Sequence, residues 1–581
     1  VSVDKDEKGE FVYEQSSGGL ATGLSSVYKN YEGFWMGWPG IAEDELSEKE
    51  KYKMKSELNK NNNYPVFLSQ EELDNYYYGF CNKTLWPLFH YFTQYTKYPE
   101  KYWKTYKKVN LKFFKALKDK LKPGDNLWIH DYHLMLLPEM IRRDFPDVKI
   151  GFFLHIPFPS SEIFRLLPWK EELLKGLLGS DLIGFHTYGY VRHFLSSVVR
   201  ILGYNKNFNE IQLKNRKVKA ELFPMGIDYK KYNESPQKPE VQKEIENIKE
   251  RTGDARIILS VDRMDYTKGI PERLKAFDYF LENNPVYRGK VTLIIIAVPS
   301  RTKIEKYEEL KIEVNELVGD INGKYGTLNW IPVWFLFKAV PFERLIGLYN
   351  MADVCLVTPL RDGMNLVSKE FVAASYDKGV LVLSEMAGSS YELSKAINIT
   401  PTRKEEIAKS IKKALEMDEV EQKQRLKVMK ERIRNYDVKR WANSFVNDLI
   451  ASDKLREEKN FDKEAKKYLR QEYNDSSDRI LVIDLHSFIE KEKTIVFNWL
   501  KKIANNNKNR MIIISRLNKN ELKKKLSGFN CYMFSQYGQY FYNGNKWLKL
   551  NVKDPGWMKD IEPIIQLHKE NNPGAYVEKT V

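Results

Sequence analysis

Residues 255–269, ARIILSVDRMDYTKG, join a short apolar run to a polar loop that carries two cations. The run has the length of a strand and the near-continuous apolar character of a strand buried on both faces. The loop after it places Arg263 and Lys268 five residues apart. Because ligands bind beyond the carboxyl ends of strands in open parallel sheets, this stretch predicts a buried strand and a candidate binding loop.

Similar apolar runs recur on both sides of this stretch, each bounded by turn residues and followed by a helical pattern. They are NLWIHD (126–131), KIGFFLHIP (149–157), DLIGFH (181–186), VTLIIIAVP (291–299) and ADVCLVTP (352–359). Strands alternating with amphipathic helices require right-handed crossovers, which predicts an α/β fold with doubly wound parallel sheets. The number of runs requires two such sheets.

The chain divides into four segments by composition. We expect a first Rossmann-like domain over 1–225 and a second over 226–452, which ends in a long helix. Residues 453–478 are dominated by charge and predict a linker. A third, small α/β unit over 479–581 opens with the strands RILVIDL and RMIIIS and continues into a Tyr-rich hairpin, CYMFSQYGQYFYNGNKWLKL.

Composition excludes several classes of protein. The chain has a net charge of +15, but lysine is enriched throughout and forms no basic stripe with interleaved aromatics, so nucleic acid is not expected as a partner. A membrane span would need about eighteen consecutive apolar residues, and none occur. Three widely spaced cysteines predict reduced thiols, not a disulfide framework or a zinc site. We therefore expect a cytoplasmic protein.

Polar side chains follow the other apolar runs as well. Arg301 follows VTLIIIAVP, and the loop after ADVCLVTP carries Arg361 and Asp362 before a helix that begins LVSKE. The free N–H groups and positive dipole end of such a helix can bind a phosphate. Taken one at a time, Arg263 and Lys268 are more often ordinary solvated loop charges.

Metal-dependent transfer from a nucleotide diphosphate commonly uses a DxD motif. Asp4, Lys5 and Asp6 form the DxD of this chain, and they lie in a polar N-terminal segment that shows no strand signal. We assign this motif to the surface and expect no metal to be needed. In a transfer reaction of this kind without a metal, Arg263, Lys268 and the helix amides would neutralise the charge on the diphosphate as it leaves.

Further clusters come from the first half of the chain. HDYHL (130–134) closes one strand and His155 closes the next, so their polar groups would face those of the second sheet. The segment YYYGFCNKTLWPLFHY (76–91) is most simply helix packing, with Tyr77 and Trp86 as alternative walls of a sugar pocket. GGLATGL resembles a glycine-rich loop, which is a weak signal alone.

Seven ordered blocks resemble the trehalose-6-phosphate synthases. They are SSGGLATGL (16–24), YYYGFCNKTLWPLFHY (76–91), HDYHLMLLPEMIR (130–142), FFLHIPFPSSEIFRLLP (152–168), SVDRMDYTKGI (260–270), AVPSR (297–301) and VTPLRDGMNLVSKEF (357–371). The resemblance covers about 15–452. It implies a GT-B arrangement of two Rossmann-like domains facing a cleft, with transfer of glucose from a nucleotide-glucose, UDP-glucose above all, to glucose 6-phosphate with retention of configuration.

The resemblance also implies the donor site. Gly18 and Gly19 would lie near the diphosphate, and Arg263 and Lys268 would hold its phosphates. Asp362 and His155 would hold the donor glucose, and Val340 would lie beside the base. The start of the helix would supply backbone amides from Leu366, Val367, Ser368, Lys369 and Glu370. The carboxylate of Glu370 would also accept hydrogen bonds from the ribose hydroxyls.

On the acceptor side, Tyr77, Trp86, Asp131 and Arg301 would bind glucose 6-phosphate, with Arg301 pairing with its phosphate. The family places no carboxylate as a covalent nucleophile, so front-face attack is implied. Members normally begin with a strand ending in SNRLP, whose arginine is a second clamp on the acceptor phosphate. This chain starts just after that point, and we expect its N-terminus to be clipped.

The third unit resembles the HAD-like phosphatase half that is often fused to these synthases. Such phosphatases use DxDxT after a strand, but here the stretch is DLHSF (484–488), so only the nucleophile position, Asp484, is retained. We expect a phosphatase remnant without activity.

Other hypotheses stay open. One is a sister transferase with another acceptor, such as glycerol 3-phosphate, and another is a non-catalytic sugar-phosphate sensor. Three further questions stay open, which are the base of the donor nucleotide, the effectors of the third unit and the oligomeric state. A homo-oligomer is one option.

Overall fold

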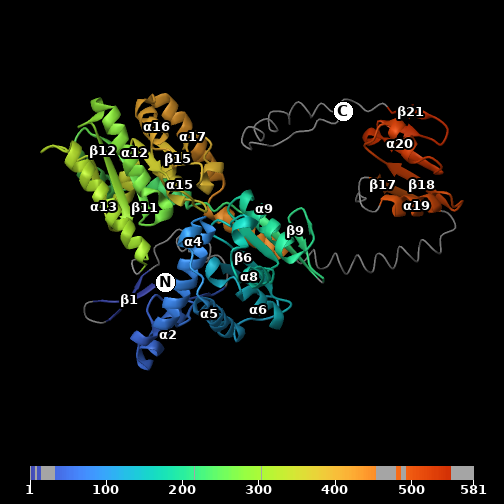
Figure 1. Ribbon diagram of the computed structural model, residues 1–581, viewed down its shortest axis with the longest axis horizontal. Helices are drawn as coiled ribbons and strands as arrows, with labels where there is room; N and C mark the ends of the chain where they lie inside the picture. Colours follow the sequence, from blue (N-terminus) through green and yellow to red (C-terminus); the bar gives the residue numbers. More distant parts are fainter. Residues whose placement is uncertain are drawn as a thin grey trace. The chain divides into compact units, whose positions relative to one another are not determined.

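The computed structural model describes residues 2–6, 10–14, 33–214, 216–301, 304–452, 479–485 and 493–550. The chain forms two compact units, Val1–Leu455 and Arg456–Val581. Figure 1 shows that the first unit contains two lobes, each built on its own sheet. Among the described residues, no helix is both long and apolar enough to cross a membrane.

The first lobe is built on a six-stranded sheet. Its order is β5 (Asn126–His130), β6 (Lys149–Phe153), β7 (Leu182–Phe185), β10 (Lys217–Leu222), β9 (Glu210–Gln212) and β8 (Lys206–Asn207). The first four strands are parallel, and β9 and β8 pair antiparallel at the edge. One face is covered by helices α5 (Glu100–Lys118), α6 (Leu137–Asp144), α8 (Lys170–Leu177) and α9 (Tyr188–Ser197).

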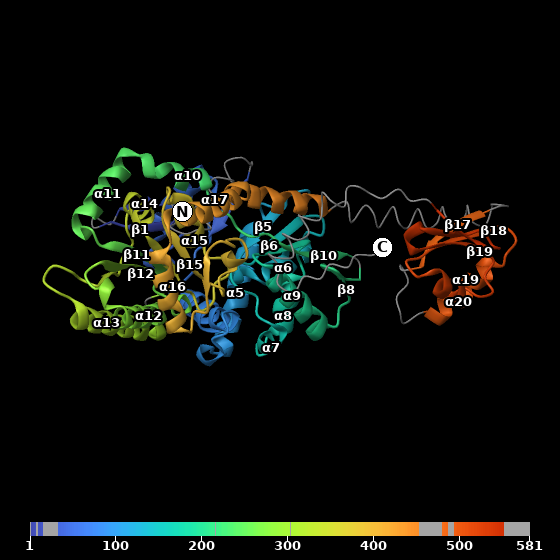
Figure 2. The same cartoon turned by 90° about the horizontal axis from the view of Figure 1, so that it is seen from above.

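The second lobe is built on a parallel six-stranded sheet. Its order is β13 (Val333–Leu336), β12 (Val291–Val298), β11 (Arg256–Arg263), β14 (Val354–Val357), β15 (Val380–Ser384) and β16 (Ile397–Ile399). Figure 2 shows helices on both faces. One layer consists of α12 (Ile270–Asn283), α13 (Glu305–Tyr325) and α16 (Lys404–Glu416). The other consists of α11 (Pro239–Thr252), α14 (Phe342–Met351), α15 (Leu366–Ala374) and α17 (Glu419–Asn435). An α/β fold with two parallel sheets, as predicted, is confirmed, and the second sheet is doubly wound.

The last helix of this unit returns to the first lobe. Helix α17 ends at Asn435, and a separate helix over 438–452 packs on the open face of the first sheet through Phe445. Two glycines make room for that ring: a Cβ on Gly151 would lie 2.6 Å from Phe445 Cε1, and one on Gly184 would lie 2.9 Å from Cε2. Glycine in a strand here marks a close approach.

The chain therefore passes between the lobes twice, and the two passages touch. Val438 N–H donates to Ile227 O at 3.0 Å. A Cβ on Gly226 would lie 2.4 Å from the carbonyl carbon of Asp437, so only glycine fits. The buried Lys369 of α15 donates to Met225 O at 2.8 Å, which ties α15 to the same point.

The N-terminal segment differs from the sequence-based expectation. Ser2–Lys5 forms strand β1, which pairs antiparallel with β2 (Phe11–Glu14), so the prediction that the DxD motif lies in a segment without a strand is wrong. Val3 explains the difference, because it is buried against a small core that includes Met54 of α2 (Glu48–Lys60). Phe11 and Tyr13 of β2 pack against the same core and help to anchor the hairpin.

The aromatic segment of 76–91 is helical, as predicted, but with an unexpected geometry. Leu73–Leu85 forms a π-helix, η2, which leads into α4 (Trp86–Phe89). The wider turn of a π-helix is often found at functional sites.

The C-terminal unit is a small α/β structure, as expected. Strands β17 (Arg479–Asp484), β18 (Asn509–Ile514) and β19 (Cys531–Ser535) are parallel, and β20 (Tyr540–Tyr542) and β21 (Trp547–Lys549) continue antiparallel. Asp484 ends β17, whereas residues 486–488 of the degenerate motif lie outside the described residues.

Candidate active site

The carboxyl ends of the two sheets of the first unit face one another, and side chains from both lobes meet there. Arg301 Nη2, beyond β12, donates to the Tyr132 hydroxyl, beyond β5, at 3.2 Å. The Tyr190 hydroxyl of α9 donates to Asp362 O, beyond β14, at 3.3 Å. The expectation that polar groups of the two sheets face each other is thus confirmed.

Lys268 and Asp362 form a buried ion pair. Lys268 lies in the short turn η7 (Tyr266–Lys268), and its Nζ donates to Asp362 Oδ2 at 2.5 Å. The side chains are 11% and 14% exposed. Asn365 Nδ2 donates to the same carboxylate oxygen at 3.0 Å. Burial would raise the pKa of Asp362, but Lys268 and Asn365 outweigh it and hold that pKa below its usual range.

Helix α15 points its N-terminus toward this pair. Its N-cap, Asn365, has φ of 72°, and its side-chain oxygen accepts the Ser368 N–H at 2.9 Å. By helix geometry, the first-turn amides of Leu366 and Val367 have no acceptor within the helix. They are therefore positioned, together with Lys268, to meet an anion.

The remaining predicted residues of α15 differ in where their side chains lie. Lys369 is buried and pairs with Glu392, so it can offer a ligand only its backbone amide. Glu370 accepts a hydrogen bond from the Tyr349 hydroxyl at 3.0 Å, and burial raises its pKa. Val340 is partly buried against the same core as Leu366 and Val367.

Arg263 and Arg301 both lie over the indole of Trp86. The guanidinium carbons are 5.2 Å and 3.7 Å from the ring centroid, respectively. Arg263 is exposed, whereas the Arg301 side chain is only 5% exposed. Trp86 of the first lobe thus makes cation–π contacts with two arginines of the second lobe.

Arg301 is held by polar neighbours. Its Nη1 donates to Asp265 Oδ2 at 2.9 Å and to the Tyr307 hydroxyl at 2.7 Å. Burial would raise the pKa of Asp265, but Arg301 and Arg263 hold it at about 2. Arg301 Nε is buried and has no hydrogen-bond partner within the described part of the chain. A fixed arginine with an unused donor suits binding of an anion such as a phosphate.

Asp131 lies at the end of β5 in a left-handed conformation, with φ of 70°. Its Oδ1 accepts the His155 N–H at 3.2 Å. Burial raises the pKa of Asp131 to about 6. A non-glycine residue with positive φ and a perturbed carboxyl is typical of a functional position.

Imidazole rings line the cleft beside Asp131. His155 Nε2 lies 3.1 Å from His130 Nδ1, and burial lowers the pKa of both residues, that of His130 to about 3. The ring of His133 stacks on that of Tyr77 at 5.9 Å. Burial lowers the pKa of His133 to about 3 as well, so all three imidazoles are neutral at pH 7. His130 and His155 each use one ring nitrogen on the other, which leaves one nitrogen of each for a further hydrogen bond.

Sequence reasoning missed several residues of this site. Tyr132, Asp265 and Tyr307 hold Arg301, but only their proximity in space reveals it. Tyr190 lies on a helix whose sequence carries no ligand signal. Of the predicted residues, Gly18 and Gly19 lie outside the described residues. In the described ranges, no group of three metal-ligating His, Cys, Asp or Glu side chains occurs.

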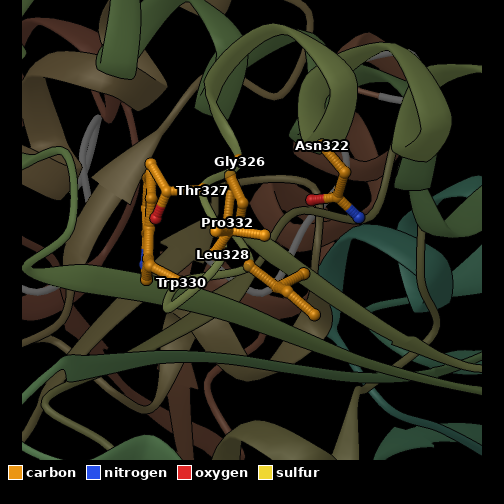
Figure 3. A pocket seen from close by; sticks show the side chains of 7 residues that line it. Asn322, Gly326, Thr327, Leu328, Trp330 and Pro332 are labelled. Atoms are coloured by element: carbon orange, nitrogen blue, oxygen red, sulfur yellow. The ribbon is translucent and has the colours of Figure 1, made fainter.

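A separate pocket lies where α13 leads into β13 (Figure 3). It shares no residue with the candidate site, and it is lined by Asn322, Gly326, Thr327, Leu328, Trp330, Ile331 and Pro332.

Comparisons with known proteins give a consistent result. The family glycosyltransferase family 20 matches residues 1–451. A bifunctional trehalose-6-phosphate synthase/phosphatase of Thermoproteus tenax is 39% identical over 97% of this chain and 80% of its own length. The 56 kDa subunit of the Saccharomyces cerevisiae UDP-forming α,α-trehalose-phosphate synthase is 43% identical over 78% of this chain and 92% of its own.

Solved structures agree. A UDP-forming α,α-trehalose-phosphate synthase from Burkholderia xenovorans, in complex with glucose 6-phosphate, has a TM-score of 0.69 and 33% identity, covering 75% of this chain and 96% of its own. A structure from E. coli bound with UDP-2-fluoro glucose also has a TM-score of 0.69, with 34% identity over 74% of this chain and 96% of its own.

Proposed function

Because this chain belongs to glycosyltransferase family 20, we propose that it transfers glucose from UDP-glucose to glucose 6-phosphate, releasing UDP and trehalose 6-phosphate. The observation that carries this proposal is the meeting of two anion sites in one cleft. Lys268 and the start of α15 lie on the second lobe, and Arg301 reaches across to Tyr132 of the first. Two phosphorylated substrates require two such sites.

The donor diphosphate would be bound by cations and amides. As the glycosidic oxygen departs, negative charge grows on the β-phosphate, and preorganised donors that need no rearrangement stabilise that charge most. Arg263 and Lys268 would supply the positive charge, and the amides of Leu366 and Val367 would supply hydrogen bonds. Glu370 would accept hydrogen bonds from the ribose hydroxyls beside Val340.

The sugars would be oriented by neutral and anionic acceptors. Asp362 and the neutral His155 would bind the donor glucose. On the acceptor side, Tyr77 and Trp86 would pack on glucose 6-phosphate, Asp131 would accept from its hydroxyls, and Arg301 would pair with its phosphate. Front-face attack follows, in which the departing phosphate oxygen accepts the proton of the attacking hydroxyl and configuration is retained.

The experiment that tests this proposal combines the purified chain with UDP-glucose and glucose 6-phosphate and follows UDP and the disaccharide by chromatography. Parallel reactions with ADP- and GDP-glucose, and with glycerol 3-phosphate as acceptor, test the alternative donors and the sister activity. Binding of both substrates without turnover would favour a sensor instead. We expect EDTA to leave the rate unchanged, and loss of activity in EDTA would require a metal.

We also propose that the C-terminal unit has no phosphatase activity. Asp484 alone of the expected motif is retained, and His486 stands where the aspartate that shuttles the proton is expected. Release of inorganic phosphate from trehalose 6-phosphate by the purified chain would refute this.

A further inference from the structure

Arg273 of α12 is fully buried beneath the two loops that carry Lys268 and Asp362. Its side chain is 0% exposed, yet each of its nitrogen atoms has a partner. Nε donates to Thr358 Oγ1 at 3.0 Å, and Nη1 donates to Ser260 Oγ. Nη2 donates to Asp262 Oδ2 at 2.9 Å and to Lys268 O at 3.2 Å. A buried guanidinium is tolerated only when it is paired and hydrogen-bonded in this way.

These acceptors belong to separate loops of the candidate site. Ser260 and Asp262 lie in the second half of β11, just before the turn that ends at Lys268. Thr358 begins the loop after β14 that leads to Asp362. One side chain therefore joins the two loops whose tips form the Lys268–Asp362 ion pair.

The two loops are also in direct backbone contact above Arg273. Leu360 N–H donates to Thr267 O at 2.8 Å. Gly269 has φ of 63°, and a Cβ there would lie 2.4 Å from Thr358 O. This contact leaves no space for the loops to settle closer if the guanidinium is removed. A smaller or less branched side chain at 273 must then leave acceptors unsatisfied.

We propose that Arg273 is a positioning residue that fixes the Lys268 turn and the Asp362 loop in the relative placement required to bind the donor diphosphate. The proposal rests on the proposed function of this site. Lysine cannot replace Arg273, because it presents its donors from a single nitrogen, whereas the planar guanidinium reaches all four acceptors at once. The role is geometric, since Arg273 is shielded from any ligand.

The test is the variant Arg273→Lys, which keeps the charge and loses the fork. Since a misplacement of about 1 Å can cost about 10²-fold, we expect its KM for UDP-glucose and its Kd for UDP to rise about ten- to hundredfold. KM for glucose 6-phosphate should stay near the wild-type value. The matched control is Arg142→Lys, which alters a partly buried arginine of the first lobe that pairs with Asp181 at 2.5 Å and lies outside the candidate site. It should lose stability without changing KM for UDP-glucose.

A milder variant guards against a folding failure. Thr358→Val removes the acceptor of Nε and the long hydrogen bond from Thr358 Oγ1 to Gly269 O at 3.4 Å. Loss of a hydrogen bond from a charged guanidinium predicts a rise of about tenfold in the Kd for UDP. Titration calorimetry with UDP, on protein whose folding is verified by circular dichroism, gives the readout. The proposal is overturned if Arg273→Lys folds and binds UDP like the wild type, or if Thr358→Val leaves UDP affinity unchanged. A wild-type chain that neither binds UDP nor turns over would instead reject the proposed function.

Discussion

Replacing Lys268 by methionine separates its catalytic role from its structural one. Methionine keeps the length of the side chain and removes the charge that pairs with Asp362 at 2.5 Å. The comparison variant is Arg263→Met, which removes the neighbouring cation of the same loop. Arg263 is exposed, whereas the Lys268 side chain is 11% exposed. The two variants should therefore lose turnover alike but differ in stability.

The expected magnitudes follow from this burial. Loss of one preorganised donor to the leaving group costs about 10²- to 10³-fold in kcat. Breaking a buried ion pair costs about 3–5 kcal/mol of unfolding free energy, and Asp362 can lessen this by taking up a proton. It also keeps its hydrogen bond from Asn365 at 3.0 Å. We expect a loss of about 2–3 kcal/mol for Lys268→Met and of at most about 0.5 kcal/mol for Arg263→Met.

Turnover is measured by coupled detection of UDP, and stability by urea unfolding. The double variant Lys268→Met/Asp362→Asn should regain most of the stability, since it leaves no unpaired carboxylate, but none of the activity. Near-normal kcat in both single variants would refute the assignment of these cations to the leaving diphosphate. An equal loss of unfolding free energy in Lys268→Met and Arg263→Met would refute the expectation that the buried Lys268 matters more for stability than the exposed Arg263.

Other perturbations test the acceptor site, the packing of the lobes and the C-terminal unit. Because the pKa of Asp131 is about 6, its carboxylate form is lost as pH falls through 6, so affinity for glucose 6-phosphate should weaken below that pH. The substrate phosphate titrates in the same range, so calorimetry on Asp131→Asn supplies the background, and identical pH profiles would exclude a role for the carboxylate. Gly151→Ala should destabilise the first unit by about 1–3 kcal/mol through its clash with Phe445, with Phe445→Leu restoring part of the loss in thermal melts; an unchanged melting temperature would contradict the packing described. Asp484→Asn should leave disaccharide synthesis intact in the chromatographic assay, and a large loss would show that the C-terminal unit supports the active fold.

The parallel sheets could be predicted from sequence because their strands are buried on both faces. Ile, Leu and Val make up six of the eight residues of β12 and four of the eight residues of β11. This pattern can be recognised without any knowledge of the neighbouring strands. Their polar ends could be predicted too, since Asp131, Arg263 and Arg301 directly follow such runs. The polar side chains of the candidate site could therefore be predicted as residues at the ends of strands.

What could not be predicted depends on contacts between distant segments. The strand Ser2–Lys5 is polar apart from Val3, and it forms because Val3 is buried by residues tens of positions away. The break of the last long helix at Tyr436–Asp437 reflects the passage beside Gly226, and neither residue is a typical helix breaker. Tyr190 and Tyr307 reach the site from helices whose positions depend on tertiary packing. No local sequence pattern identifies these two residues.

The contact of Gly226 with Asp437 has a consequence for motion. Two covalent connections that lie side by side act as one pivot, so the halves of the first unit can swing apart about that point but cannot slide past each other. Lys369 ties α15 to this pivot through its hydrogen bond to Met225 O. Any such swing would thus move α15 little, because that helix is tied to the pivot.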